Sequence, residues 1–165
     1  MVIFITGPRH SGKTECVKNI IRILKEQKTG LAGVLSPSEY TGGEKNLYFV
    51  QSAASGKKKY LLSTSSGEPR ISPAGFKFAR DILSRASNRA IVIIDEFGPL
   101  EMAGAGYFAQ TAALCKRPFG SVIITVRTSL ARKAPGVLNI REYKLLDVGK
   151  CGPEKTAELC LKALK

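Results

Sequence analysis

Eight residues near the start of the chain constrain its fold more than any other stretch. They read Gly-Pro-Arg-His-Ser-Gly-Lys-Thr and match the P-loop pattern G-x-x-x-x-G-K-[ST] at every fixed position. Glycines in this pattern let the backbone curl so that successive N–H groups point at phosphate oxygens. The lysine reaches the β- and γ-phosphates, and the final hydroxyl binds Mg²⁺. We therefore expect a nucleoside triphosphate to be bound by Gly7, Pro8, Arg9, His10, Ser11, Gly12, Lys13 and Thr14.

The stretches on either side of this loop supply the context that the motif needs. Val2 to Thr6 is an apolar, β-branched run of strand length, and Glu15 to Gln27 has the apolar spacing of a helix. Strand, loop and helix then follow one another, and the helix N-terminus is directed at the phosphates. We expect Lys13 to serve in catalysis as well as in binding, and Thr14 to be a metal ligand.

A second apolar run ends in two carboxylates. Residues 91–94 read Ile-Val-Ile-Ile, which is typical of a strand buried on both faces in a parallel sheet. Asp95 and Glu96 follow directly and form a Walker B pattern. We expect Asp95 to hold Mg²⁺, directly or through Thr14. Glu96 is one residue further and free of the metal, so it is the candidate general base for an attacking water.

A third apolar run, residues 121–126, is followed by Arg127 on the expected phosphate side of the sheet. An arginine in this position can act as an arginine finger in cis, which stabilises transition-state charge. The alternative is a surface arginine of a basic protein, and Arg132 is open to the same two interpretations. Thr125, at the end of the run, either senses the γ-phosphate or packs against the P-loop.

The rest of the chain continues the alternation of strand and helix patterns. The predicted strands lie at 31–35 and 143–148, and two β-rich runs at 46–52 and 58–62 form an antiparallel hairpin. The predicted helices lie at 73–86, from the loop at 97–101 to Cys115, at 153–164 and, as a short candidate, at 129–133. Residues 36–43 and 63–72 read as loops. The alternation predicts one α/β domain over residues 1–165, with helices on both faces of the sheet and the hairpin inserted.

The chain is strongly basic. It has 26 basic and 13 acidic residues, a net charge of +13 and a pI near 9.8. Such a field attracts triphosphates, and it also attracts RNA or DNA. The basic residues are scattered, however, and the single tight run, Lys57 to Lys59, comes with no RNP-type aromatic pattern or zinc-finger spacing. A solvated basic surface and a nucleic-acid partner both stay open.

Composition argues against several other classes of protein. Hydrophobic residues make up 44% of the chain, with no run of 18 apolar residues, so we expect no membrane span. The first residues belong to the predicted strand and lack the charged region of a signal peptide. Cys16, Cys115, Cys151 and Cys160 show no C-x-x-C spacing, which argues against zinc and against a disulfide framework. We expect a reducing, cytoplasmic location.

The stretch from Asp95 to Glu101 carries a resemblance to a known family. With the N-terminal P-loop and the mid-chain hairpin, it resembles the thermophile-type nucleoside-triphosphatase family, whose animal members are called cancer-related nucleoside-triphosphatase. The family reads Asp-Glu-Ile-Gly-(Lys/Pro)-(Met/Leu)-Glu, and Phe97 stands here for the isoleucine. The resemblance implies a P-loop NTPase with a RecA-like, mostly parallel sheet. It also implies Mg²⁺-dependent release of phosphate from ATP, GTP and other nucleoside triphosphates with low base selectivity, and Glu96 as the water-activating acid.

Four features depart from the family's pattern. Glu15 follows the P-loop where the family often has a second threonine, and Pro99 stands where it often has lysine. An arginine common in the family's hairpin has no clear match near Lys45 and Asn46. The pair Arg9-His10 is bulkier than the usual small residues, and we expect His10 to face solvent. These differences bear on rate and substrate preference more than on the fold.

Two other functional classes stay open. A nucleotide or small-molecule kinase also uses a P-loop, but it needs an acceptor site and commonly an arginine-rich lid, for which residues 57–70 are a weak candidate. A nucleic-acid-associated ATP-binding module would account for the basic charge and predicts salt-sensitive affinity for RNA or DNA. The Asn-Lys-x-Asp guanine signature is absent, which argues against a Ras-like switch.

Overall fold

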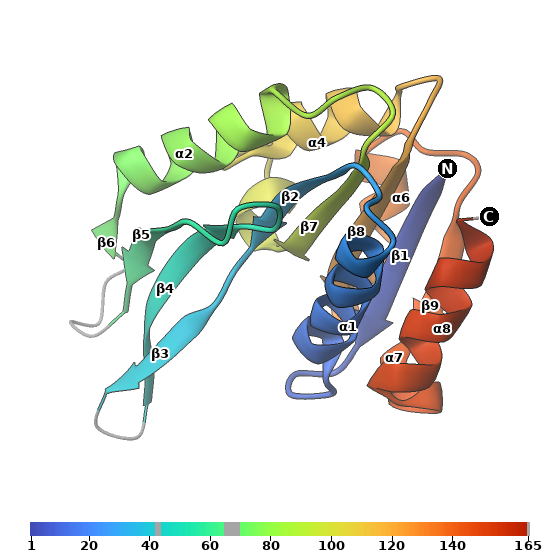
Figure 1. The fold of residues 1–165 in the computed structure, drawn as a ribbon. Coiled ribbons are helices and arrows are strands. Elements are labelled where there is room, and N and C mark those ends of the chain that lie inside the picture. Colours follow the sequence, from blue (N-terminus) through green and yellow to red (C-terminus); the bar gives the residue numbers. More distant parts are fainter. Residues whose placement is uncertain (42–43, 65–69, 165) are drawn as a thin grey trace.

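The computed structural model of the protein describes residues 1–41, 44–64 and 70–164 (Figure 1). Within them nine strands form one sheet in the order β6-β5-β4-β2-β7-β8-β1-β9, with β3 paired to β4. The strands are β1 (Val2–Gly7), β2 (Leu31–Leu35), β3 (Ser38–Thr41), β4 (Glu44–Ser52), β5 (Lys58–Ser63), β6 (Arg70–Ile71), β7 (Ile91–Phe97), β8 (Ser121–Arg127) and β9 (Lys144–Asp147).

The five strands β2, β7, β8, β1 and β9 are parallel, which confirms the predicted α/β class. β8 lies between β1, which leads into the P-loop, and β7, which ends in the Walker B acids. This is the RecA-like arrangement that the resemblance implies. Because parallel strands end at the same edge of the sheet, the residues that follow β1, β7 and β8 meet there.

The remaining strands, β3 to β6, form an antiparallel wing that continues the sheet through pairing of β4 with β2 (Figure 1). The predicted hairpin is confirmed as β4 and β5. The prediction of loops at 36–43 and 63–72 was wrong at β3 and β6. These two strands pair with β4 and β5 at the margins of the sheet. Such pairing uses backbone groups, so an edge strand can form without an apolar face. Residues 42–43 and 65–69, the latter part of the lid candidate, lie outside the described residues.

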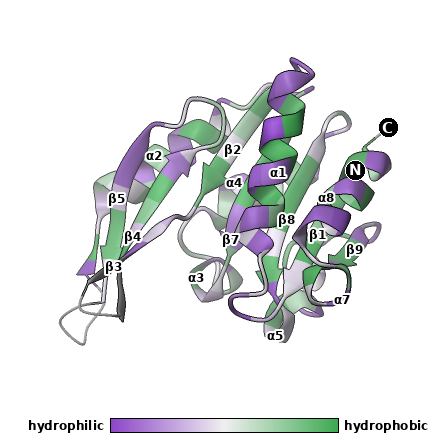
Figure 2. Ribbon diagram, turned by 60° about the horizontal axis from the view of Figure 1, so that its bottom comes forward, coloured by the Kyte–Doolittle hydropathy of each residue, from purple (hydrophilic) through white to green (hydrophobic). Residues whose placement is uncertain are grey.

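Helices cover both faces of the sheet, as predicted (Figure 1). Phe4 of β1 packs in the core on the α2 and α4 side, whereas its neighbours Ile3 and Ile5 pack under α1 and α8. Figure 2 shows the hydrophobic central strands and the banded, amphipathic α1. The helices are α1 (Lys13–Glu26), α2 (Pro73–Ser84), α3 (Pro99–Met102), α4 (Phe108–Cys115), α5 (Thr128–Ala131), α6 (Ala134–Val137), α7 (Val148–Cys151) and α8 (Pro153–Ala163). No helix of the described residues has the length and apolarity to cross a membrane.

The segment between β7 and Cys115 differs from the predicted single helix. It forms two helices, α3 and α4, separated by residues 103–107. Gly104 and Gly106 have φ of 80° and 62°, a left-handed conformation that interrupts a right-handed helix. The break places Tyr107 at the start of α4, beside the end of β7.

Candidate active site

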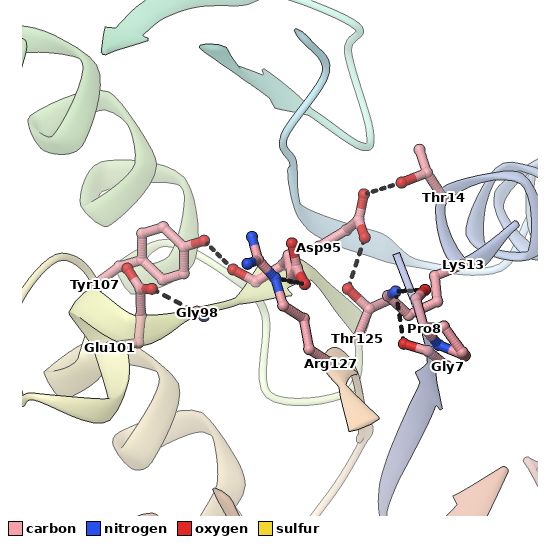
Figure 3. Close-up of polar contacts among 11 residues, drawn as sticks. Gly7, Pro8, Lys13, Thr14, Asp95, Gly98, Glu101, Tyr107, Thr125 and Arg127 are labelled. Carbon is pink, nitrogen blue, oxygen red and sulfur yellow. Dashed lines mark hydrogen bonds and ion pairs between the residues drawn. The ribbon is translucent and has the colours of Figure 1, made fainter. Parts of the chain in front are cut away.

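The P-loop runs from the end of β1 to the start of α1. α1 begins at Lys13, two residues earlier than predicted, because Gly12 caps it with a φ of 90°. Arg9 and His10 are exposed, and His10 has a φ of 60°. The Nζ of Lys13 donates hydrogen bonds to the carbonyls of Gly7 and Pro8 at 2.9 and 2.8 Å (Figure 3). The lysine ammonium therefore lies at the loop itself, where a phosphate chain would be cradled.

Two C-terminal helices support this loop from behind. Gly149 of α7 lies against Pro8, and Pro153 at the start of α8 lies against Gly12. Asp147 accepts a hydrogen bond from the Gly149 N–H at 2.9 Å and so caps α7. The sequence carried no motif for this contact, because it depends on β9 pairing with β1 over more than a hundred intervening residues.

Asp95 lies at the end of β7, only 2% exposed, with a hydroxyl on each carboxylate oxygen (Figure 3). Thr125 donates to Oδ1 at 2.6 Å, and Thr14 donates to Oδ2 at 3.2 Å. Burial raises the pKa of Asp95, with a smaller upward contribution from the Glu96 charge, while the two hydroxyls and Lys13 act in the opposite direction. In the structure, the Thr125 hydroxyl thus holds the Asp95 carboxylate in place.

The pair Thr14 and Asp95 has the chemistry of a Mg²⁺ site. Both offer oxygen atoms, the ligands that Mg²⁺ prefers, and they are within hydrogen-bond distance of each other beside the P-loop. Across the described ranges no group of three or more His, Cys, Asp or Glu side chains could hold a metal. Mg²⁺ commonly binds one or two protein ligands together with water and substrate phosphates, so the donors present fit this ion.

Glu96 has a different environment from its neighbour, to which a cis peptide bond joins it. Its Oε1 accepts a hydrogen bond from the Nε of Arg127 at 3.0 Å, and the Glu96 and Arg127 side chains are 28% and 33% exposed. Its backbone carbonyl accepts a hydrogen bond from the Tyr107 hydroxyl at 2.8 Å (Figure 3). The ends of β7 and β8 thus bring together the two residues predicted to be the base and the finger.

These groups surround one cavity of about 720 Å³. The predicted residues that line it are Arg9, His10, Ser11, Gly12, Lys13, Thr14, Asp95, Glu96 and Arg127. Gly7 and Pro8 are not in its wall and instead hold Lys13 through their carbonyls. Arg132 is exposed and is not part of the lining. Nine of the predicted site residues therefore converge on a single cavity, while Thr125 lies outside its lining and contacts it through Asp95.

The cavity also has walls that sequence reasoning missed. They are Glu15, Ser36, Tyr48 and Thr64. Ser36 follows β2, while Tyr48 and Thr64 come from the antiparallel wing, so one side of the cavity is built by the insertion. No local pattern marks Tyr48 and Thr64, because the wing reaches the cavity only through the pairing of β4 with β2.

Glu101 and Tyr107 are two further buried residues beside the site. Glu101 is 4% exposed and accepts a hydrogen bond from the Gly98 N–H at 3.1 Å. Burial raises the pKa of Glu101, and backbone N–H groups that donate to it partly offset the effect. Burial also raises the pKa of Tyr107 well above its usual value, so this phenol stays a neutral donor at physiological pH. Sequence analysis noted Glu101 only as part of the family stretch and did not single out Tyr107.

Three of the four cysteines, the buried Cys16 and Cys160 and the half-buried Cys115, offer no thiolate chemistry to this site. Cys16 follows the P-loop in α1, and burial, with the Asp95 charge as a second cause, raises its pKa to about 12. Burial likewise raises the pKa of Cys115 and Cys160 to about 12. A thiol is nucleophilic only as the thiolate, so these three side chains act as packing groups at neutral pH.

Comparison with known proteins extends these observations. A family model described as NTPase matches residues 2–154. Nucleoside-triphosphatase THEP1 of Methanothermobacter thermautotrophicus is 31% identical over 109 residues, which cover 62% of this chain and 63% of that protein, so the match spans less than two thirds of that relative. Nucleoside-triphosphatase THEP1 of Thermofilum pendens is 25% identical over 153 residues, 87% of this chain and 84% of that protein.

Two solved structures share the fold. The crystal structure of THEP1 from Aquifex aeolicus aligns over 100% of this chain and 99% of that chain, with a TM-score of 0.77 at 21% identity. The solution structure of a human cancer-related nucleoside triphosphatase aligns over 99% and 96%, with a TM-score of 0.80 at 17% identity. Because the family model runs from the first strand to the start of the last helix, this chain belongs to the NTPase family.

Proposed function

We propose that this chain is a Mg²⁺-dependent phosphohydrolase that releases phosphate from nucleoside triphosphates with low base selectivity. The observation that carries the proposal is the convergence of Lys13, the Thr14–Asp95 pair and the Glu96–Arg127 pair on one cavity. Phosphate binding, metal binding and a base for water are the groups that such hydrolysis requires. The name of the relatives, nucleoside-triphosphatase, agrees with this activity.

Each group has one task in the proposed reaction. The P-loop N–H groups and Lys13 bind the phosphate chain, and Thr14 and Asp95 hold Mg²⁺, which when bound neutralises charge on the phosphate oxygens. Glu96 accepts a proton from water as the water oxygen bonds to the γ-phosphorus. The bond from that phosphorus to the β–γ bridging oxygen breaks, and the nucleoside diphosphate carries away the electron pair.

Arg127 can orient Glu96 and contact the phosphate at the same time, because different nitrogens of its guanidinium serve the two contacts. Its Nε is bonded to Oε1 of Glu96, which fixes the carboxylate and leaves it a second oxygen with which to accept a proton. The guanidinium also carries N–H donors on Nη1 and Nη2, which can contact a phosphate oxygen. Arg127 then both orients the base and places positive charge beside the transferred group, in cis.

Low base selectivity is supported by the character of the cavity wall away from the P-loop. The wing and the residue after β2 contribute Tyr48, Thr64 and Ser36 there. An aromatic ring stacks on any base, and hydroxyls both donate and accept hydrogen bonds. Among the described residues of this wall, no side chain offers the paired, one-sided donors or acceptors by which a site rejects one base strongly.

The test is the release of inorganic phosphate from ATP, GTP, CTP and UTP, each with Mg²⁺ and with EDTA. Wild type should release phosphate from all four with Mg²⁺ and from none with EDTA, and Lys13→Ala should be inactive because it no longer binds the triphosphate. Phosphate transferred only to an added acceptor would identify a kinase instead. Release that requires added RNA would identify a nucleic-acid-associated module.

A further inference from the structure

The hydroxyl of Tyr107 lies at the point where the catalytic strand is least supported by its neighbours. The register of β7 pairs Ile94 with Ile124 of β8, then shifts, and resumes with Phe97 opposite Val126. On the other side, pairing with β2 ends at Ile94. The two Walker B acids lie in this gap. Neither is paired with β8 or β2, so strand pairing does not fix their backbone as it fixes the rest of β7.

Tyr107 supplies the missing support. Its hydroxyl donates to the Glu96 carbonyl at 2.8 Å, and its ring is only 3% exposed (Figure 3). The ring packs beside Phe76 of α2, with the two centroids 6.4 Å apart. The Ser36 side chain, at the root of the wing, lies near the Tyr107 hydroxyl. A buried phenol that packs against Phe76 and donates a hydrogen bond has little freedom to move, so the Glu96 backbone is tied to a rigid point.

Glu101 in turn fixes Tyr107. Its carboxylate accepts from the Gly98 N–H at 3.1 Å, and it lies against Gly106 and the backbone of Tyr107, so it bridges the segment between Gly98 and Tyr107. Gly106 makes this bridge possible, since a Cβ there would overlap Oε1 of Glu101. The final glutamate of the Asp95–Glu101 stretch thus joins the end of β7 to the start of α4.

We propose that Tyr107 is a positioning residue for Glu96, and that Glu101 holds Tyr107 in place for this task. The inference rests on the proposed function, in which Glu96 activates water. Glu96 is then fixed at two points, its backbone by Tyr107 and its carboxylate by Arg127. Small displacements of a catalytic group cost large factors in rate, so the support acts on turnover rather than on nucleotide affinity.

The test is a double-mutant cycle of Tyr107→Phe and Glu96→Gln, with turnover and nucleotide affinity measured separately. Tyr107→Phe should lower kcat about 10-fold, with the affinity for ATP and Mg²⁺ within about 2-fold of wild type. In the Glu96→Gln background the same change should cost less than about 2-fold, because there is no longer a base to position. Equal losses in the two backgrounds, or a wild-type kcat for Tyr107→Phe alone, would overturn the inference while leaving the proposed function intact.

Three further measurements keep the outcome clear. Tyr143→Phe removes the hydroxyl of an exposed tyrosine just before β9, at the edge of the sheet opposite to the cavity, and should leave kcat unchanged. Urea unfolding of each variant gives the folded fraction, to which rates are normalised. Glu101→Gln disturbs Tyr107 without touching its hydroxyl and should also lower kcat selectively, in a manner coupled to Glu96. Wild-type turnover by Glu96→Gln would contradict both the role of Glu96 and this inference.

Discussion

Asp95 and Glu96 are neighbours in the chain that the fold places in opposite environments. Asp95 is buried and bonded to two hydroxyls, which suits a carboxylate that stays in place to hold a cation. Glu96 is partly exposed in the cavity and bonded to one arginine, which suits a carboxylate that meets water. The proposed function assigns two roles to these adjacent acids, and their different surroundings support this division, which is a common way in which enzymes use similar groups.

Arg127 should matter for rate more than for affinity. Arg127→Ala removes both the contact to Glu96 and the charge beside the transferred phosphate, so we expect kcat to fall about 10- to 100-fold with nucleotide affinity little changed. Arg127→Lys keeps the charge without the guanidinium fork and should recover only part of the loss. Steady-state phosphate release checks both variants. Arg132→Ala, an exposed arginine outside the cavity, is the matched control, and an equal loss there would contradict the role assigned to Arg127.

The buried carboxylate of Glu101 predicts a pH dependence of stability. Its pKa is raised in the folded protein, so the ionised form opposes folding above that pKa, and this penalty disappears as the pH falls through it. Wild type should therefore gain stability relative to Glu101→Gln, whose side chain does not titrate, as the pH falls from about 7 to about 4.5. Urea unfolding of both proteins at the two pH values measures the difference. A gap that is constant, or that moves against wild type, would contradict the raised pKa.

Sequence reasoning reached the residues of the site unevenly. Gly7 to Thr14 could be predicted because the whole motif is contiguous and its chemistry requires each fixed residue. Asp95, Glu96 and Arg127 could be predicted because they come directly after strongly apolar runs in the sequence, and the structure places them at the ends of β7 and β8. Tyr107, Ser36 and Tyr48 could not, since each reaches the site through a turn or a strand pairing that involves distant parts of the chain.

At the level of elements, β2 approaches β7 closely at a glycine. Gly33 has a φ of 123°, and a Cβ there would overlap the backbone of Ile93, two residues before Asp95. Gly33→Ala should destabilise the protein by about 2–3 kcal/mol because both the conformation and the space exclude a side chain. Chemical denaturation gives the value. Gly30→Ala, just before β2, meets only an ordinary contact and should cost less than about 1 kcal/mol, so equal losses would contradict this reading.

The elements of the parallel sheet were predictable from local sequence, whereas the wing and the α3–α4 break were only partly so. Apolar, β-branched runs buried on both faces mark β1, β7 and β8 clearly. β3 and β6 are short, and their pairing uses backbone groups that any sequence possesses. The break at residues 103–107 depends on two glycines adopting left-handed conformations, which the glycines permit but do not require.

At the level of the whole molecule, the net charge of +13 is the feature that the proposed function explains least. Two lysines of the one tight basic run contact neighbouring side chains of the wing and of α2. Lys58 pairs with Glu39 at 2.7 Å and lies over the Phe49 ring, and Lys59 lies over Phe78. The described contacts therefore favour a diffuse electrostatic field over a dedicated nucleic-acid surface.

This field predicts weak, salt-sensitive binding of RNA with no effect on catalysis. Affinity for single-stranded RNA should fall steeply between about 50 and about 200 mM salt, as expected when counterion release dominates. Phosphate release at the higher salt should be the same with and without RNA. Fluorescence anisotropy and phosphate release measure the two quantities, with heparin as a matched polyanion. Stimulation by RNA but not by heparin would contradict the prediction and favour the nucleic-acid-associated module.

The central claim is that Glu96 activates the water that attacks a triphosphate bound at the P-loop. Its most direct test is single-turnover phosphate release from saturating ATP and Mg²⁺ by wild type and Glu96→Gln, alongside the ATP affinity of each. We predict an affinity within about 3-fold of wild type and a rate lowered about 100-fold or more. A wild-type rate would contradict the claim, and a parallel loss of rate and affinity would mean that Glu96 organises the metal and phosphates instead.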